Sequence, residues 1–289
     1  MPAGGRPTVR SRRLGSTLRR LREAAGADQQ RAAEYIAGSK AKISRIEAGH
    51  VSARPGDVRL LLELYGVEDP GMCRHLEQLA REANKRGWWM SYRLPDGTSD
   101  FFALEQDATC IRSWQTLLIP GLLQTAAYTR ELAMGNSSIL KPEEAENVVR
   151  VRQQRRASFE KSGARFAAVI SEHAVSTPMA SPATHREQLL DLLAAMDSAN
   201  ISLQILPAAD WMTTRCASPF VMLSFDKEWT PTAVGQDTFN NVAIAEAPEV
   251  VSAYAHAFER LRSSALTPDG SREFIKQTMA ELPEELEPQ

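Results

Sequence analysis

Apolar residues in the first 66 positions recur at the three- and four-residue spacing of short amphipathic helices. Leu14, Leu18, Leu21 and Ala25 form one apolar stripe, which stops at Gly26, a residue typical of a helix C-terminus. Capping residues, prolines and glycines divide the positions that follow into further helices. These are predicted over residues 29–37, 40–48, 55–65 and 71–85. The N-terminal segment is therefore expected to be all-α.

Two of these helices, joined by Gly38 and Ser39, have the pattern of a helix-turn-helix. Ser39 can cap the second helix, which Ile43 and Ile46 would anchor from the inside. Its other side carries Lys40, Lys42, Ser44 and Arg45. A short helix with one buried and one cationic face suits the DNA major groove, although a plain bundle with a solvated basic face is the alternative. Double-stranded DNA is the partner that this pattern favours.

From about residue 100, strand-like alternation of apolar residues takes turns with helical periodicity. The expected strands span residues 110–119, 166–171, 201–206, 220–225 and 241–245. The expected helices span residues 122–134, 142–162, 185–197, 248–265 and 268–282. We predict an α+β protein, with an N-terminal all-α helix-turn-helix bundle at residues 13–86 and a mixed α/β C-terminal domain at residues 87–282. A flexible basic tail (1–12) and an acidic tail (283–289) are expected to flank them.

The formal net charge of −2 hides an uneven distribution along the chain. The first 55 residues contain 12 basic and 4 acidic residues, a net charge of +8, whereas the remainder contains 22 basic and 32 acidic residues, a net charge of −10. Attraction to a polyanion is therefore concentrated at the N-terminus. The acidic remainder is expected to repel DNA.

A set of residues in the N-terminal bundle carries a resemblance to a known family: Leu18-Arg-Arg-Leu-Arg-Glu-Ala-Ala-Gly26, Asp28, Gln29, Ala32, Ala33, Ser39, Ile43-Ser-Arg-Ile-Glu47 and Gly49. Residues 14–66 thereby resemble the Cro/CI-type (xenobiotic response element) helix-turn-helix regulators. The resemblance implies that Gln29 holds a phosphate, that the following helix contacts bases and phosphates, and that Arg22 and Glu47 form a structural ion pair. The predicted DNA-binding residues are Gln29, Ser39, Lys40, Ala41, Lys42, Ser44 and Arg45.

A second resemblance extends over nearly the whole chain. It rests on Trp88-Trp89, Glu105, Ile111-Arg-Ser-Trp114, Ile119-Pro-Gly-Leu-Leu-Gln-Thr125, Arg152-Gln-Gln-Arg155, Ile205-Leu-Pro207 and Leu261–Leu266. These segments resemble a large family of actinobacterial regulators that join this helix-turn-helix to a C-terminal domain of unassigned function. The resemblance implies a role in development or antibiotic production, and often a small acidic partner protein encoded nearby.

We therefore expect a sequence-specific DNA-binding transcriptional regulator whose C-terminal domain senses a ligand or binds a partner protein. Its recognition helix, at about residues 40–48, would enter the major groove. A homodimer is expected because one module contacts too few phosphates for tight specific binding. The alternative is an antitoxin-like interaction module that sequesters a small cognate protein and binds DNA only for autoregulation. Either protein would be cytoplasmic, and associated with the nucleoid when bound to DNA.

Several other classes of protein have no support in the sequence. Cys73, Cys110 and Cys216 lack metal-ligand spacing, and no run of about 18 apolar residues predicts a membrane span. Nucleophile-elbow, phosphate-loop and His-Glu-x-x-His motifs are missing. We expect no enzyme, no catalytic or metal site, no cofactor and no membrane partner.

Overall fold

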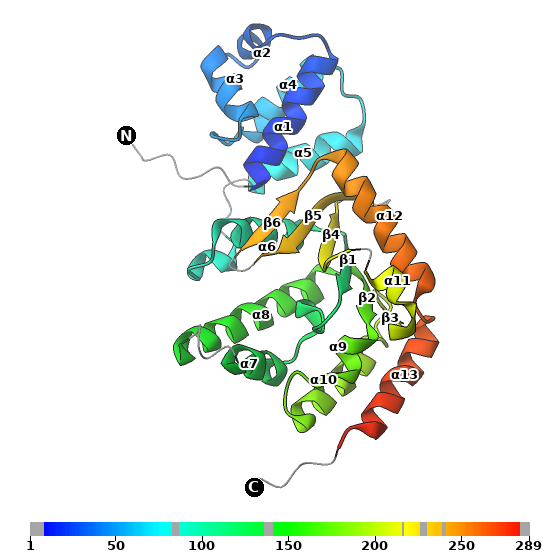
Figure 1. Cartoon of the computed structure of the whole chain (residues 1–289). Helices are drawn as coiled ribbons and strands as arrows, with labels where there is room; N and C mark the ends of the chain where they lie inside the picture. The colour runs from blue at the N-terminus through cyan, green and yellow to red at the C-terminus, as the bar shows by residue number, and fades with distance from the viewer. Residues whose placement is uncertain are drawn as a thin grey trace. The chain divides into compact units, whose positions relative to one another are not determined.

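A computed structural model describes residues 9–82, 87–135, 141–215, 217–225, 230–238 and 241–283 (Figure 1). The chain divides into two compact units, Met1–Met90 and Ser91–Gln289. In the described residues the first unit contains helices and no strand, and the second contains a mixed sheet with helices, so the predicted α+β class is confirmed. Within the described ranges, no helix is long and apolar enough to cross a membrane.

Five helices build the N-terminal unit: α1 (Val9–Ala24), α2 (Gln29–Tyr35), α3 (Lys40–Glu47), α4 (Pro55–Leu64) and α5 (Pro70–Glu82). The predicted apolar stripe of α1 forms part of the core, because Leu14 and Leu18 are buried and Leu21 packs against them at the edge. Ala25, the last residue of that stripe, is exposed. Gly26 has a φ of +65°, in agreement with its predicted role as a left-handed C-cap.

The start of α1 corrects a predicted boundary. Residues 9–12 were expected in the flexible tail, but the helix begins at Val9. Arg10 and Ser11 are 5% exposed, and the guanidinium of Arg10 lies 6.0 Å from the centre of the Trp89 ring. These contacts stabilise an extra helical turn that hydrophobic periodicity does not reveal. Residues 1–8 of the predicted tail lie outside the described residues.

Glycines allow α1 and α3 to approach closely. A Cβ on Gly15 would lie 2.2 Å from the carbonyl oxygen of Ile46, and a Cβ on Gly49 would lie 2.8 Å from the Cα of Arg12. Gly49 also has a φ of +75°, a conformation that other residues rarely adopt. The C-terminus of α3 is therefore held directly against the backbone of α1.

The C-terminal unit is built around a six-stranded sheet with the order β3-β2-β1-β4-β5-β6. The strands are β1 (Cys110–Gln115), β2 (Arg165–Ser171), β3 (Ile201–Leu206), β4 (Phe220–Ser224), β5 (Pro231–Asp237) and β6 (Val242–Ala245). The β1–β2 and β2–β3 pairs are parallel, whereas β1–β4, β4–β5 and β5–β6 are antiparallel. The sheet is therefore mixed, with β1 at the change of direction.

The longer helices of this unit are α6 (Asp96–Asp107), α7 (Ala126–Gly135), α8 (Pro142–Ser162), α10 (Pro182–Ala195), α12 (Pro248–Ser264) and α13 (Pro268–Glu281). Shorter turns are η1 (Trp88–Ser91, across the unit boundary), η2 (Gly121–Leu123), α9 (Glu172–Ser176), η3 (Ala208–Asp210) and α11 (Trp211–Thr214). Helices α12 and α13 contact the sheet, as do α6 and α9, whereas α8 packs against α6, α7 and η2.

Sequence periodicity missed α6 and β5. Five consecutive residues of α6, Phe101–Glu105, are buried, so the helix shows no amphipathic alternation. It packs between β6 and α8, which bury more than one of its faces. The helix predicted at 122–134 is instead the short turn η2 followed by α7, because Gln124 and Thr125 hold the intervening chain in an extended conformation.

The two faces of the sheet have different surroundings. On one face, Trp114, Val169 and Val234 pack against Phe258 and Leu261 of α12 in a closed apolar core. The alternate positions point to the opposite face, as strand geometry requires. Among them are Ile111, Ser113, Gln115, Val221 and Gly235, which face a cavity.

Candidate DNA-binding surface and a cavity in the C-terminal unit

Two side-chain caps shape the helix-turn-helix formed by α2 and α3. The Asp28 carboxylate accepts a hydrogen bond of 2.7 Å from the backbone N–H of Arg31, and Ser39 Oγ accepts one of 3.1 Å from that of Lys42. The left-handed residue of the turn is Ala37, with a φ of +48°, rather than the neighbouring Gly38. The turn therefore contains a strained alanine where glycine would be the ordinary residue.

The predicted contact residues of α3 share one exposed face. Ser39, Lys40, Ala41, Ser44 and Arg45 are exposed, whereas Ile43 and Ile46 are buried on the opposite side. The side chains of Lys40 and Arg45 thus extend from the helix into solvent. The arrangement presents two cations and three small side chains to a partner.

Lys42 differs from the other predicted contact residues. It is only partly exposed, and its Nζ lies 2.7 Å from Asp57 Oδ2 at the N-terminus of α4. The carboxylate offsets part of the charge that Lys42 would offer to a phosphate. Lys42 therefore ties α3 to α4 in this structure.

A buried network stands behind the exposed face. Arg22 Nε donates to Glu47 Oε1 at 2.6 Å, Arg22 Nη2 donates to Glu47 Oε2 at 3.1 Å, and Nη1 donates to the carbonyl of Ala27. Gln29, predicted to hold a phosphate, also donates its amide to Glu47 Oε2, at 2.8 Å. Burial, together with the charge of Glu47, raises the pKa of the adjacent Tyr65 to about 12. The network joins α1, α2 and α3 and keeps one amide N–H of Gln29 available.

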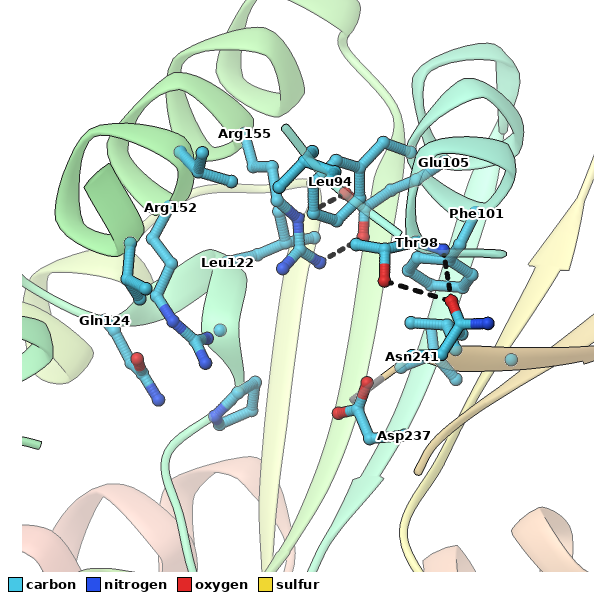
Figure 2. A pocket seen from close by; sticks show the side chains of 18 of the residues that line it. Leu94, Thr98, Phe101, Glu105, Leu122, Gln124, Arg152, Arg155, Asp237 and Asn241 are labelled. Atoms are coloured by element: carbon cyan, nitrogen blue, oxygen red, sulfur yellow. Dashed lines mark hydrogen bonds and ion pairs between the residues drawn. The ribbon is translucent and has the colours of Figure 1, made fainter. Parts of the chain in front are cut away.

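The C-terminal unit contains a cavity of about 1200 Å³ between the open face of the sheet, α6 and α8 (Figure 2). Phe101, Phe102 and Leu122 contribute to an apolar part. Val148, Arg152 and Arg155 contribute from α8 at the spacing of one helical face. The volume exceeds that of ordinary packing defects and is slightly above the usual range of ligand pockets.

A tied segment forms one wall of the cavity. The Gln124 amide donates to the carbonyl of Ile119 at 2.7 Å, and the Gln188 amide donates to the carbonyl of Leu123 at 2.8 Å. Between these points, Gly121 faces Arg152 so closely that a Cβ there would lie 2.4 Å from Arg152 Nη1. Buried amides thus fix the backbone that lies against this guanidinium.

The two arginines of α8 have different surroundings. Arg155 forms a two-pronged ion pair with Glu105, at 2.7 and 2.9 Å, and its guanidinium lies 4.6 Å from the centre of the Phe102 ring. Arg152 points into the cavity beside Gln124 (Figure 2) and, within the described part of the chain, has neither a hydrogen bond nor an ion pair. Burial and the charge of Arg155 lower the pKa of Arg152 to about 10, which leaves it protonated at neutral pH.

Sequence reasoning assigned no role to the cavity residues. Glu105, residues 119–125, Arg152 and Arg155 belong to segments that carry the second resemblance, but nothing in them indicated a shared wall. The spacing of Arg152 and Arg155 was an available signal, although in a charged helix it is typical of a solvated face. Among the residues that the structure describes, no group of His, Cys, Asp and Glu has the arrangement of a metal site.

Comparison with known proteins identifies both units. A family model described as "Domain of unknown function (DUF5753)" matches residues 98–277, and one described as "Helix-turn-helix domain" matches residues 13–76. The predicted helix-turn-helix is thereby confirmed, and the protein belongs to the class of DNA-binding regulators. No curated protein and no solved structure matches the chain.

Proposed function

The chain belongs to the family of the DUF5753 domain and carries a helix-turn-helix domain. From this premise we propose that it is a sequence-specific transcriptional regulator of the Cro/CI (xenobiotic response element) type and one of the actinobacterial regulators that it resembles. The observation that carries the proposal is the exposed face of α3, where Lys40 and Arg45 are free of the core while Ile43 and Ile46 anchor the helix behind them. Helix α3 is the recognition helix, and it enters the major groove.

The residues of this face divide into two roles. Arg45 reads a base, because a guanidinium can donate two parallel hydrogen bonds to guanine O6 and N7. Lys40, Ser39 and Ser44 position the helix on phosphates, as does the remaining amide N–H of Gln29. Ala41 offers only a methyl contact to thymine. Lys42 contributes less than its charge suggests, because Asp57 holds it.

The regulator acts as a homodimer. A single module offers too few phosphate contacts for tight binding, and two copies would read half-sites about one helical turn apart. The operator is then a pseudopalindrome. Sedimentation of the protein alone and with its operator tests this, and a monomer in both conditions contradicts it.

The C-terminal unit senses a small molecule or holds a partner protein such as a small acidic one. The cavity supports the first role because it is large, partly apolar and lined by a few polar groups. We assign no enzymatic reaction to it, because the sequence lacks the motifs of catalytic sites. A DNA partner places the protein in the cytoplasm, on the nucleoid when bound.

Selection of fragmented genomic DNA by the purified full chain tests the proposal. The wild type is compared with Lys40→Ala/Arg45→Ala at a stated salt concentration. The matched control, Arg59→Ala/Arg81→Ala, removes the same charge from two exposed arginines that pair with Glu77 away from α3. We expect a sharp motif with the wild type and control, and its loss with the α3 variant.

Single variants then separate the roles within α3. Arg45→Ala should weaken operator binding by about 1–3 kcal/mol and relax the preference at one base position. Lys42→Ala should have a smaller effect. Broad retention of DNA that depends on salt and is equal in all variants would mean phosphate attraction alone. The antitoxin-like alternative would then be favoured, and copurification of a small cognate protein would support it.

A further inference from the structure

Among the residues that the structure describes, one cation of the C-terminal cavity has neither a hydrogen bond nor an ion pair. Arg152 reaches the cavity from α8, next to an arginine whose charge Glu105 already balances. A guanidinium in such surroundings has lost part of its hydration, and Asp237 and Glu105 attract it without forming an ion pair with it. An anionic ligand would supply that missing partner.

The backbone next to Arg152 leaves room for its guanidinium and is held by hydrogen bonds. Gly121 leaves space for the guanidinium where any other residue would place a Cβ 2.4 Å from Nη1. The amides of Gln124 and Gln188 hold the segment that contains Gly121. The side chain therefore sits in a fixed recess instead of folding back onto the protein surface.

The charges around the cavity limit the ligand's own charge. Four arginines line it, Arg93, Arg150, Arg152 and Arg155, against three carboxylates, Glu105, Glu144 and Asp237. The balance is one positive charge, and Asp237 lies across the cavity from Arg152 (Figure 2). A polyphosphate would bring more negative charge than these groups balance and would be repelled by Asp237.

The rest of the lining defines the body of the ligand. Aromatic and aliphatic side chains cover much of the space beyond Arg152, including Phe101, Phe102, Leu94, Leu122 and Val221. A small hydrophilic anion such as acetate would leave this apolar surface uncovered. Burial of apolar area would instead stabilise a ligand with a ring or a hydrocarbon chain.

We propose that this cavity binds an amphipathic organic monoanion, whose carboxylate pairs with Arg152 and whose apolar body covers Phe101, Phe102 and Leu122. The inference deepens the sensing role in the proposed function and rests on it for its biological meaning. Binding itself is independent of DNA, so it is measured without DNA, and its failure is distinguishable from a failure of the DNA-binding proposal.

The probe is anilinonaphthalene sulfonate, an aromatic monoanion whose fluorescence rises in an apolar site. The full-length wild type is titrated beside Arg152→Met, which keeps most of the aliphatic stem of the side chain but removes the guanidinium and its charge. Arg130→Met is the matched control, because it removes one charge from a surface arginine paired with Glu146 outside the cavity. We expect Arg152→Met to weaken binding about tenfold or more, as for the loss of a hydrogen bond to a charged group, and Arg130→Met to leave it unchanged.

Gly121→Ala provides a second variant that retains all charges. Its Cβ would displace the Arg152 guanidinium, so probe affinity should fall while circular dichroism and thermal unfolding stay close to those of the wild type. This variant keeps the test decisive if Arg152→Met does not fold. Equal affinity in the wild type and in every folded cavity variant would overturn the proposal.

Competition against the probe defines the head group and the body. Phenylacetate should displace the probe at a concentration at least about tenfold lower than neutral phenylacetamide, acetate or phenyl phosphate. Phenylacetamide as effective as phenylacetate would show an apolar pocket without anion recognition. Phenyl phosphate more effective than phenylacetate would overturn the assignment to a monoanion.

Discussion

Each unit of this protein buries an arginine–glutamate pair, and the two pairs are used differently. In the N-terminal unit, Arg22 donates two hydrogen bonds to the Glu47 carboxylate and one to the Ala27 carbonyl, and Gln29 donates a further one to Glu47. In the C-terminal unit, Arg155 and Glu105 form a similar pair at the wall of a cavity, with Arg152 beside them. The first network is closed, because its charges pair with one another, and it stabilises the helices behind the exposed face of α3. The second is open, because the neighbouring Arg152 keeps its charge available for a ligand.

The largest expected difference comes from removing the two glutamates. Glu47→Ala should lower the free energy of unfolding by about 3–5 kcal/mol, because it leaves the buried Arg22 with only the more distant, exposed Glu23, 3.6 Å away. Glu105→Ala should cost less, about 1–3 kcal/mol, because water in the cavity can solvate Arg155. Urea denaturation measures the loss, and hydrogen exchange in α3 and α8 assigns it to a unit.

Glu146→Ala is the control for both variants, because Glu146 is an exposed partner of Arg130. Its effect should stay below about 1 kcal/mol. Equal losses for Glu47→Ala and Glu105→Ala would contradict the contrast between a closed and an open network.

The next effect concerns the close contact between α1 and α3 in the N-terminal unit. Gly15→Ala should destabilise it by about 1–3 kcal/mol, because the new Cβ meets the backbone carbonyl of Ile46, which cannot rotate away. Gly56→Ala is the matched control, since its Cβ meets no atom within 4 Å. The control should gain a few tenths of a kcal/mol from helix propensity. Thermal unfolding of both variants checks the opposite signs.

The next prediction concerns His185, an ionisable group packed in the protein interior, and the dependence of stability on pH. His185 is fully buried, its Nε2 lies 2.7 Å from the Val175 carbonyl, and its Nδ1 has no hydrogen-bond partner in the described part of the chain. Burial lowers its pKa below the ordinary value of 6.5. The unfolded chain therefore binds more protons below that pH, and stability falls as the pH falls from about 7 toward the folded-state pKa.

The contribution of His185 should be at most about 1.4 kcal/mol per pH unit. His185→Gln retains a donor for Val175 and should flatten the dependence of unfolding free energy on pH between about 7 and 5. If the two proteins have parallel pH profiles, folding does not lower the pKa of His185 and the assignment is wrong.

The smallest effect concerns the turn of the helix-turn-helix. Ala37→Gly should stabilise the protein by about 0.5–1 kcal/mol, because glycine removes the cost of a left-handed alanine while adding some freedom to the unfolded chain. The gain should appear in thermal unfolding without a change in operator preference. A loss of stability would show that the alanine methyl makes a contact worth more than the strain.

Local patterns were sufficient for most of the N-terminal unit. The capping residues Asp28 and Ser39, the left-handed Gly26 and the buried Ile43 and Ile46 lie where periodicity and capping rules place them. In the C-terminal unit the same rules located β2, β3, β4 and the long helices α8, α12 and α13. Sequence alone can predict these elements, because the pattern of apolar residues repeats every three or four residues in a helix and every second residue in a strand.

The tertiary structure decided what those rules could not reach. Helix α6 lacks amphipathic periodicity because partners bury more than one of its faces, and Lys42, a predicted contact residue, forms an ion pair with Asp57 on another helix. The cavity depends on the packing of α6 and α8 against alternate residues of several strands of the sheet. The sequence by itself therefore determined most of the elements and the uneven distribution of charge along the chain. Only the packing of distant segments decided that Arg155 has a partner and that Arg152 faces open space.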